Sequence, residues 1–389
     1  MRVLVITKIF PNAREPLSCP FNRQQFAALS RLCDVEVLAT IPWFPMAAAF
    51  GRWSAAGRLI DVPWHDVIDG VRVRHPRYLL VPKIGHSIAG YLYAGSLLPV
   101  VARYRGRVDV ILGAWAYPDG YASVLLAKLL GVPAVVKLHG SDVNVVARLR
   151  GPRKHLERVL PLAHRVVAVS KALKESAIEL GVEADRIDLV RNGVDGEIFH
   201  VRDRAQARAG FGLPKDGRVI LYVGTLSRPK GAMDAISAFE QATRHDDDVR
   251  LVLVGDGPGR GECEAAAARL GDRVLVVGAR PQREVALWMA ACDVLTLPSW
   301  NEGTPNVILE ALACGRRVVA TRVGGIPDVL STPLLGELVP PRDVDGLAGA
   351  FLRAARAPYD PKEIAALGAR GDWEESAAKL RDSLQKALE

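Results

Sequence analysis

The segment of this chain best suited to chemistry contains two glutamates, Glu302 and Glu310, with the predicted start of a helix between them. Glu302 follows a strand-like apolar run, and Glu310 lies about a turn and a half into the amphipathic segment that comes next. Thr304 is a suitable N-cap and Pro305 a suitable first helical residue. The backbone N–H groups of residues 303–306 would then point out of the helix start and form an anion site.

A carboxylate accepts hydrogen bonds and donates none, so each of these glutamates suits a pair of vicinal hydroxyls. Two such acceptors beside a phosphate-binding helix start indicate a pocket for a sugar nucleotide. The alternative is a strand, a turn and a helix with two solvated glutamates. The spacing alone leaves both interpretations open.

The composition indicates an ordinary globular protein. The length of 389 residues favours two to three domains, and 49% apolar with 24% charged residues argues against disorder. The chain starts with a strand-like run at 2–6, and no apolar run reaches the roughly 18 residues of a membrane span. The scattered cysteines show neither a disulfide framework nor metal-ligand spacing. We therefore expect a soluble, cytoplasmic protein without a signal peptide.

Positive charge is concentrated in the first half of the chain. Residues 1–200 hold 26 Lys and Arg against 17 Asp and Glu, whereas residues 201–389 hold 25 against 26. An anionic partner would therefore meet the first half. An ordinary basic surface without a partner is the alternative.

Short Val/Ile/Leu runs alternate with helical segments along the whole chain. The clearest runs lie at 35–38, 109–112, 134–138, 165–169, 188–190, 219–223, 250–254, 273–277, 293–297 and 317–320. Such runs indicate buried parallel strands in α/β layers. The polar stretch 197–217 separates two series of runs and is the predicted linker. We therefore expect two Rossmann-like domains, 1–200 and 201–389, facing across a cleft, with ligands bound beyond the carboxyl ends of the strands.

Two further motifs fall at predicted strand ends. His139 directly follows a strand-like run and would project from its carboxyl tip, although a single histidine is more often structural. Arg228 and Lys230 lie in a strand-to-helix turn, where they would neutralise a diphosphate or simply be solvated. The turn is not a P-loop, because no Gly-Lys-Ser/Thr occurs there. The glycine-rich segment 255–259 fails the dinucleotide fingerprint and predicts a tight turn.

Together these motifs resemble the retaining nucleotide-sugar glycosyltransferases of family 4, which have the GT-B fold. The resemblance covers nearly the whole chain, and its most specific part is the Glu-x7-Glu motif at 302–310. The matching segments are PSWNEGTPNVILEALACGRRVVATRVGGIPDVL (298–330), HGSDVN (139–144), VAVSKALKE (167–175), RNGVD (191–195), YVGTLSRPKG (222–231) and LVGDGP (253–258).

The resemblance implies a role for each motif residue. His139 would contact the transferred sugar, Lys230 the diphosphate and Glu302 the sugar hydroxyls, and these three would be catalytic. Glu310 would bind the ribose. The other donor-binding residues that the resemblance implies are Gly224, Thr225, Arg228, Arg280, Gly303, Thr304, Pro305 and Asn306, with 277–280 as the base-binding loop.

Some positions depart from the family pattern. Thr225 stands where many members have arginine, so Arg228 or Arg191 would supply the second positive charge. Residues 10–22 contain no glycine, whereas many members have a Gly-Gly loop after the first strand. Similar glycine-free loops occur in members that build surface polysaccharides. Asp328 replaces a glutamate.

The resemblance implies transfer of a hexosyl group with retention from a UDP- or GDP-sugar to a glycan or polyprenyl-linked acceptor. It implies no catalytic metal and no further cofactor. The absence of an obvious nucleophile favours a same-face, dissociative displacement, and no nucleic-acid partner is expected. The tail at about 372–389 resembles the final helix of the family, which crosses back to the first domain. A non-hydrolytic sugar-nucleotide epimerase and a pure binding protein are the alternatives.

Two segments of the first half combine aromatic and basic residues. They predict peripheral contact with an anionic membrane, at the inner face of the cell membrane, where a polyprenyl-linked acceptor would be presented. A surface that meets only a soluble sugar is the alternative. The residues concerned are Trp43, Phe44, Phe50, Arg52, Trp53 and Arg58 within 41–59, and Arg148, Arg150, Arg153, Lys154 and Arg158 within 148–158.

Overall fold

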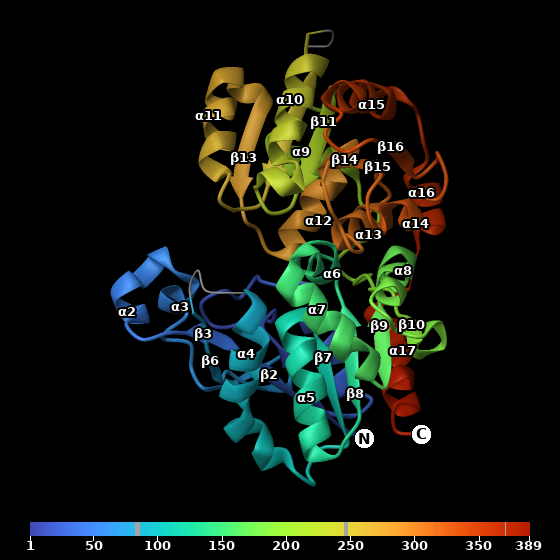
Figure 1. The fold of residues 1–389 in the computed structure, drawn as a ribbon. Coiled ribbons are helices and arrows are strands. Elements are labelled where there is room, and N and C mark those ends of the chain that lie inside the picture. Colours follow the sequence, from blue (N-terminus) through green and yellow to red (C-terminus); the bar gives the residue numbers. More distant parts are fainter. Residues whose placement is uncertain (82–85, 245–247, 370) are drawn as a thin grey trace. The chain divides into compact units, whose positions relative to one another are not determined.

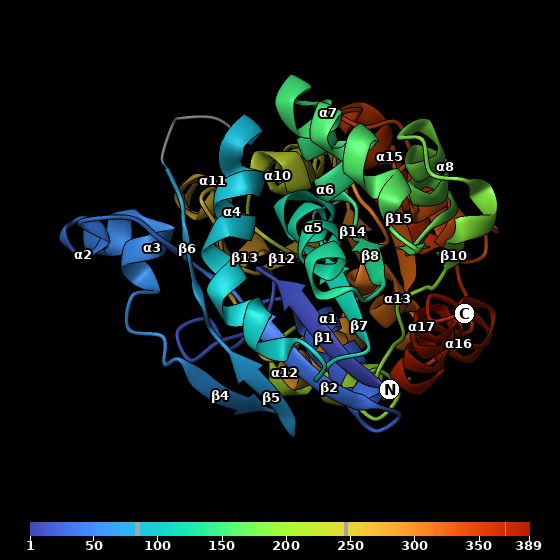
Figure 2. The same ribbon diagram turned by 60° about the horizontal axis from the view of Figure 1, so that its bottom comes forward.

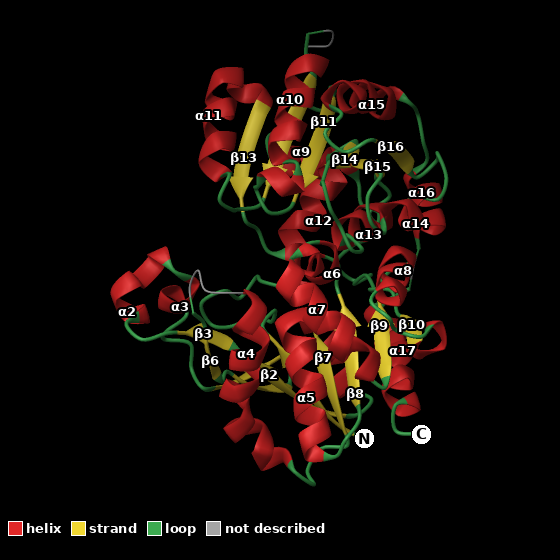
Figure 3. Cartoon of the chain, viewed as in Figure 1, coloured by secondary structure: helices red, strands yellow, loops and turns green. Residues whose placement is uncertain are grey.

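The chain folds into two compact units. The computed structural model describes residues 1–81, 86–244, 248–369 and 371–389, without the side chains of Phe50, Arg52, His86, Ser87 and Arg148. Unit 1 comprises Met1–Gly193 together with Trp373–Glu389, and unit 2 comprises Val194–Asp372. Helices and strands alternate within each unit (Figures 1 and 3).

Within the described residues, unit 1 is built on an eight-stranded sheet with the order β10-β9-β8-β7-β1-β2-β5-β4. Neighbouring strands run parallel except for the β4–β5 hairpin. A separate parallel pair joins β3 to β6. The strands are β1 (Arg2–Thr7), β2 (Asp34–Ala39), β3 (Ile41–Trp43), β4 (His65–Ile68), β5 (Val71–Arg74), β6 (Arg77–Leu79), β7 (Val110–Ala114), β8 (Ala134–Leu138), β9 (Arg165–Ala168) and β10 (Ile187–Leu189).

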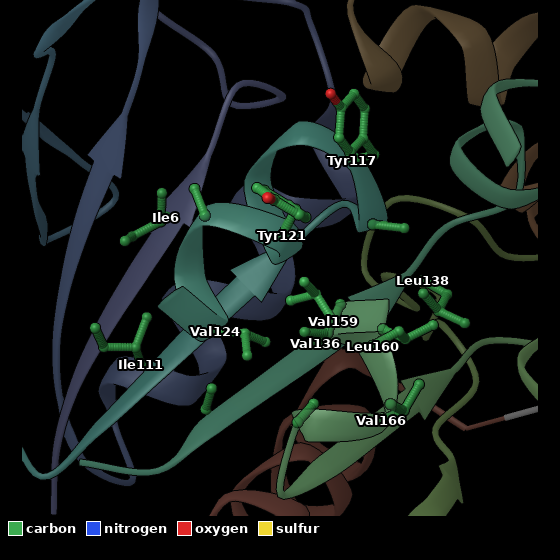
Figure 4. Packing of buried hydrophobic residues seen from close by; sticks show 14 of the residues in the cluster. Ile6, Ile111, Tyr117, Tyr121, Val124, Val136, Leu138, Val159, Leu160 and Val166 are labelled. Atoms are coloured by element: carbon green, nitrogen blue, oxygen red, sulfur yellow. The ribbon is translucent and has the colours of Figure 1, made fainter. Parts of the chain in front are cut away.

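Helices cover both faces of the unit 1 sheet. On one face, α1 and the C-terminal α17 share a core with β1 and β2. On the other face α4, α5 and α7 lie side by side (Figure 2). There, side chains such as Ile6, Ile111, Val124 and Val136 pack together (Figure 4). The helices are α1 (Pro20–Ser30), α2 (Ala47–Phe50), α3 (Ala55–Arg58), α4 (His86–Val101), α5 (Tyr121–Leu130), α6 (Ser141–Asn144), α7 (Arg150–Val159), α8 (Lys171–Glu179) and α17 (Trp373–Lys386).

The described part of unit 2 contains a six-stranded, fully parallel sheet with the order β13-β12-β11-β14-β15-β16. This is the 3-2-1-4-5-6 order of the Rossmann fold. Its strands are β11 (Arg218–Val223), β12 (Val249–Val254), β13 (Val274–Gly278), β14 (Val294–Leu297), β15 (Arg317–Thr321) and β16 (Gly336–Val339). Its helices are α9 (Arg204–Gly210), α10 (Ala232–Ala242), α11 (Arg260–Leu270), α12 (Gln282–Ala291), α13 (Asn306–Ala313), α14 (Ile326–Val329), α15 (Val344–Arg356) and α16 (Pro361–Gly368).

The α/β class predicted from the sequence is confirmed, but the predicted linker at 197–217 is wrong. This segment contains α9 and belongs to unit 2. Arg208 of α9 is buried, and its guanidinium donates to the Asp293 carboxylate at 2.6 Å and to the carbonyl of Ala291 at 2.9 Å. One charged residue of this polar segment therefore belongs to a buried ion pair.

None of the helices in the described ranges combines the length and the apolar composition that a bilayer span requires.

Candidate active site

The strand order of the unit 2 sheet reverses direction between β11 and β14. Rossmann-like sheets bind ligands at such a topological switch point. Lys230 follows β11 and Glu302 follows β14. The ammonium of Lys230 lies 2.7 Å from Oε1 of Glu302, and the Ser299 hydroxyl donates to the same oxygen at 2.8 Å. The Lys230 side chain is 33% exposed and that of Glu302 10%. The structure thus places an accessible ion pair at this switch point.

Two contacts, one from Tyr222 and one from Pro298, fix the loop that carries Lys230. The hydroxyl of the buried Tyr222 lies 2.8 Å from the carbonyl oxygen of Thr225 and 3.2 Å from that of Lys230. Gly231 adopts a φ of +73°, and a Cβ there would lie 2.0 Å from the carbonyl oxygen of Pro298. Only glycine allows this approach, so the two loops that carry the ion pair are packed against each other.

Helix α13 starts one residue later than the sequence predicted. Pro305 occupies the N-cap position with ψ of 108°, and Asn306 is the first helical residue, so Thr304 is not the N-cap. Pro305 also has no N–H group, so it cannot contribute to the predicted anion site. Thr304 and Asn306 each already interact within the protein.

The loop after β15 closes on Glu302 and its neighbour. Gly325 donates its N–H to the carbonyl of Gly303 at 2.7 Å. Gly324 adopts a φ of +52°, and a Cβ there would lie 1.8 Å from the carbonyl oxygen of Glu302. The backbone around the first glutamate is therefore fixed by close contact.

The second glutamate is in a different environment. Glu310 is half-buried on α13. Burial raises the pKa of its carboxyl to about 7, although a hydrogen bond from Gln282 opposes this rise. Glu310 is thus the carboxylate of this region whose charge changes near neutral pH.

The remaining donor-binding residues are near the ends of β11 and β13. Gly224 packs so closely against Gly255 that a Cβ on Gly255 would lie 1.8 Å from the Gly224 carbonyl oxygen. Thr225 is exposed. Arg228 is exposed and pairs with Glu262 at 3.2 Å, and Arg280 pairs with Glu284 at 2.8 Å.

A second arginine, Arg260 of α11, lies beside the predicted base-binding loop. The guanidinium groups of Arg260 and Arg280 lie 3.6 and 3.7 Å from the position of a Cβ on Gly278. Arg260 also pairs with Glu264 on its own helix and with Asp256 in the preceding turn. This contact becomes visible only once α11 and β13 are folded side by side.

In unit 1, His139 directly follows β8. Its ring packs near Phe21, at a centroid distance of 5.2 Å, and stacks on Trp115 at 6.0 Å. Its Nε2 is buried and has no hydrogen-bond partner among the described residues. Burial lowers the pKa of His139 well below its usual value, and the nearby Lys137 adds to this shift. The imidazole is therefore neutral at physiological pH.

The backbone of His139 is held by a carboxylate to which the sequence analysis gave no role. Asp142 is fully buried and accepts the backbone N–H groups of Ala116, His139, Gly140 and Val143 at 2.7 to 3.1 Å. Such a set of amides satisfies a buried negative charge without a counter-ion. Asp142 thus positions the His-Gly turn.

A second buried carboxylate lies at the switch point of unit 1, between β1 and β7. Asp119 accepts the backbone N–H of Lys8 at 2.5 Å and the Tyr93 hydroxyl at 3.1 Å. Burial raises its pKa to about 6, and its Oδ2 is unpaired within the described part of the chain. The Lys8 ammonium lies over the Trp115 ring, 5.2 Å from its centre.

Known protein families match both units. The family described as "Glycosyltransferase Family 4" matches residues 22–197, and "Glycosyl transferases group 1" matches residues 217–356. The putative teichuronic acid biosynthesis glycosyltransferase TuaC of Bacillus subtilis is 30% identical over 364 residues, which cover 91% of this chain and 89% of that protein. The chain belongs to glycosyltransferase family 4. The D-inositol 3-phosphate glycosyltransferase of Xylanimonas cellulosilytica is 33% identical over 356 residues, 84% of either chain.

Solved structures confirm the predicted GT-B fold of this family 4 glycosyltransferase. Anabaena Alr3699/HepE, solved in complex with UDP, aligns with a TM-score of 0.73 and 21% identity, covering 99% of this chain and 100% of that one. The sucrose-phosphate synthase of Thermosynechococcus elongatus aligns with a TM-score of 0.69 and 21% identity, covering 100% and 97%. The return of the final helix α17 to unit 1 is part of this fold.

In this glycosyltransferase, the residues expected to bind the donor do not all contact one another. Lys230 and Glu302 form the central pair, with Gly303 beside them, whereas Arg228 and Arg280 are paired with acids of their own unit. Arg191, the alternative second charge, is exposed and belongs to unit 1. Among the described residues, no three His, Cys, Asp or Glu side chains converge as metal ligands do.

Proposed function

We propose that this enzyme transfers a hexosyl group from a UDP- or GDP-sugar, with retention, to a glycan or polyprenyl-linked glycan during synthesis of a surface polysaccharide. The Lys230–Glu302 pair at the switch point of unit 2 carries this proposal. It is supported by HepE, whose structures contain UDP, UDP with glucose, or UDP-glucose, and by TuaC, named for teichuronic acid biosynthesis.

In the proposed reaction, Lys230 leaves Glu302 and binds the donor diphosphate, assisted by Arg228 and by the positive end of the α13 dipole. Positive charge placed there stabilises the leaving group as the bond from the anomeric carbon to the phosphate oxygen breaks. Glu302, released from Lys230, accepts a hydroxyl of the transferred sugar, and Glu310 accepts the ribose diol. These protein groups supply the charge, so the proposal includes no metal and no cofactor.

The acceptor oxygen would attack on the face from which the diphosphate leaves, and its proton would pass to the departing phosphate oxygen. The proposal uses no protein nucleophile. Neutral His139 contributes an Nε2 that lacks a partner among the described residues and would hydrogen-bond a sugar hydroxyl. Membership of family 4 argues against the sugar-nucleotide epimerase.

Membrane contact remains part of the proposal. Trp43 and Trp53 are 42% and 85% exposed within 41–59. Arg150, Lys154 and Arg158 are exposed on α7, whereas the side chains of Phe50, Arg52 and Arg148 lie outside the description. Such a surface suits the anionic inner face of the cell membrane. Sedimentation with anionic and zwitterionic vesicles at low and high salt tests this: salt-sensitive binding to the anionic vesicles alone is expected, and no such binding would remove the contact.

Release of nucleoside diphosphate from UDP- and GDP-sugars, with and without glycan acceptors, tests the function. We expect acceptor-dependent release and a product with the anomeric configuration of the donor. Release without an acceptor would favour an epimerase, and no release with any donor would favour a binding protein. An inverted product would contradict the retaining mechanism.

A further inference from the structure

A cavity of about 190 Å³ lies in unit 1 beyond the carboxyl ends of three neighbouring strands. β1, β2 and β5 are adjacent and parallel, and the residues that directly follow them are Lys8, Thr40 and His75. All three line the cavity. A Rossmann-like sheet binds ligands at this edge.

The ring of His75 is fixed by one nitrogen and leaves the other unused. Nδ1 lies 2.9 Å from the carbonyl oxygen of Ala39, which can only accept, so Nδ1 carries the hydrogen. In the neutral ring, Nε2 is then a hydrogen-bond acceptor. His75 has no exposed surface. Its Nε2 is buried and has no hydrogen-bond partner in the described part of the chain. An unpaired buried acceptor is unfavourable, and a ligand hydroxyl would satisfy it.

Thr40 offers a second acceptor to the same cavity. Its hydroxyl lies 2.9 Å from the hydroxyl of Tyr93, and the single hydrogen of Tyr93 goes to Asp119. Thr40 must therefore be the donor in its contact with Tyr93. The lone pairs of its oxygen are then not used by Tyr93, and Thr40 lines the cavity.

The cavity wall is held in place before any ligand arrives. The guanidinium of Arg77 donates to the carbonyl oxygens of His75 at 2.6 Å and Ile60 at 3.2 Å, and also to that of Val62. These bonds tie the segment after α3 to the end of β5. The apolar lining includes Ile41, Pro42 and Leu59.

The charges of the lining argue for an uncharged ligand. Lys8 and Glu15 are oppositely charged residues of the lining, so their formal charges cancel. A cavity of similar volume at the opposite end of β1 and β2 is lined instead by Arg2, Arg72, Arg74, Arg103 and Arg107 with Asp34 and Glu36. That cavity would attract anions, whereas the cavity beside His75 favours groups that donate hydrogen bonds without carrying negative charge.

We propose that the cavity beside His75 binds an uncharged, hydroxyl-rich sugar residue of the acceptor, with His75 Nε2 and Thr40 Oγ1 accepting hydrogen bonds from its hydroxyls. The apolar wall covers a face of the sugar ring, and the Lys8 ammonium donates to a further oxygen. This inference rests on the proposed transfer to a glycan and adds the acceptor group that is recognised.

Two variants remove the acceptors with little change in shape. In His75→Asn the amide nitrogen replaces Nδ1 toward Ala39 and nothing replaces Nε2, whereas Thr40→Val removes only the hydroxyl. Arg103→Ala, in the basic cavity, is the matched control. Saturation-transfer NMR measures binding of methyl glycosides of glucose, galactose, mannose and N-acetylglucosamine, with glucose 1-phosphate and methyl galacturonoside as anionic probes.

At least one uncharged glycoside should bind the wild type and Arg103→Ala equally, and about tenfold more weakly to His75→Asn and Thr40→Val. Binding of the anionic probes alone, of no probe, or of glycosides equally to both cavity variants would overturn the proposal. If His75→Asn fails to fold, Thr40→Val decides. Thermal shifts with UDP and GDP on the same samples separate the two claims: nucleotide binding without glycoside binding refutes only the acceptor cavity.

Discussion

The two motif regions of this enzyme satisfy their charges in different ways. In unit 1, the Asp142 carboxylate is fully buried and bound by four backbone N–H groups. In unit 2, the Glu302 carboxylate is bound by two side chains, the Lys230 ammonium and the Ser299 hydroxyl. Backbone amides cannot leave without unfolding the turn, whereas an ammonium on a flexible stem can change its partner.

We call the turn that Asp142 holds the rigid region, and the Lys230–Glu302 pair the exchangeable region. Backbone hydrogen bonds to Asp142 hold the turn that carries His139. The lowered pKa of His139 keeps its ring neutral before a ligand binds. Lys230 is paired with Glu302, and in the proposed reaction it is released when the donor diphosphate competes for it. We therefore expect mutations in unit 1 to affect stability first and mutations in unit 2 to affect donor binding and rate first.

The largest effect is expected at Lys230. Lys230→Ala removes the preorganised positive charge and should lower the transfer rate about 10²- to 10³-fold. Single-turnover release of nucleoside diphosphate measures this effect. Lys215→Ala, an exposed lysine of the same unit, is the control and should keep the wild-type rate. A Lys230→Ala enzyme with an unchanged rate would remove Lys230 from the site.

Asp142→Ala tests the rigid region. The N–H groups of Ala116, His139 and Gly140 lose their acceptor, whereas that of Val143 keeps the carbonyl of Gly140. We expect a loss of about 3 kcal/mol in the free energy of unfolding. Urea denaturation measures it, with the exposed Asp185→Asn as control. Glu302→Gln should lower the same quantity by less than Asp142→Ala does, because the one-third exposed Lys230 ammonium keeps contact with water and the new amide oxygen still accepts from Ser299. Equal effects of Asp142→Ala and Glu302→Gln would abolish the distinction between the regions.

The pH dependence of stability tests the environment of Glu310. Burial raises its folded pKa to about 7 from an ordinary value of 4.5, so between these values the folded state holds the proton and the unfolded state releases it. Stability should therefore fall as pH rises through this window, by about 1.4 kcal/mol for each unit of pKa separation. Denaturation of wild type and Glu310→Gln at several pH values isolates the effect. A constant difference between them would show that Glu310 is not desolvated.

The smallest effect is expected at Arg228. Its pair with Glu262 is exposed, so Arg228→Ala should change stability by less than about 1 kcal/mol. If Arg228 supplies the charge that Thr225 lacks, the transfer rate should fall about tenfold. An unchanged rate in Arg228→Ala together with a reduced rate in Arg191→Ala would assign the second charge to Arg191.

Much of the fold was readable from the sequence because the parallel strands are buried on both faces. Runs such as 134–138 and 250–254 are mostly apolar and coincide with β8 and β12 within a residue. The β4–β5 hairpin was missed, although its turn residues Asp69 and Gly70 are a recognisable signal. The helix α9 was missed because its segment is polar and mostly exposed, with only Ala207 and Arg208 of the helix buried.

The sequence named the candidate site residues, but it did not show which of them contact one another. Glu302, Glu310 and Lys230 follow from local motifs. The pairing of Lys230 with Glu302 joins residues 72 positions apart and depends on β11 lying next to β14. Asp142 stands inside a recognised motif, yet its binding to the Ala116 N–H arises only in the folded sheet. His75 had no local signal, because its unpaired nitrogen is a property of the packing around it.

The exchange of Lys230 between Glu302 and the donor diphosphate is tested most directly by calorimetric titration of UDP and GDP into wild type and Glu302→Gln. Glu302→Gln frees the ammonium and removes a negative charge beside the diphosphate. The variant should therefore bind the nucleotide severalfold more tightly than the wild type while transferring sugar more slowly. Glu240→Gln, an exposed acid of the same unit, should bind as the wild type does. Weaker or unchanged nucleotide binding by Glu302→Gln would contradict the exchange.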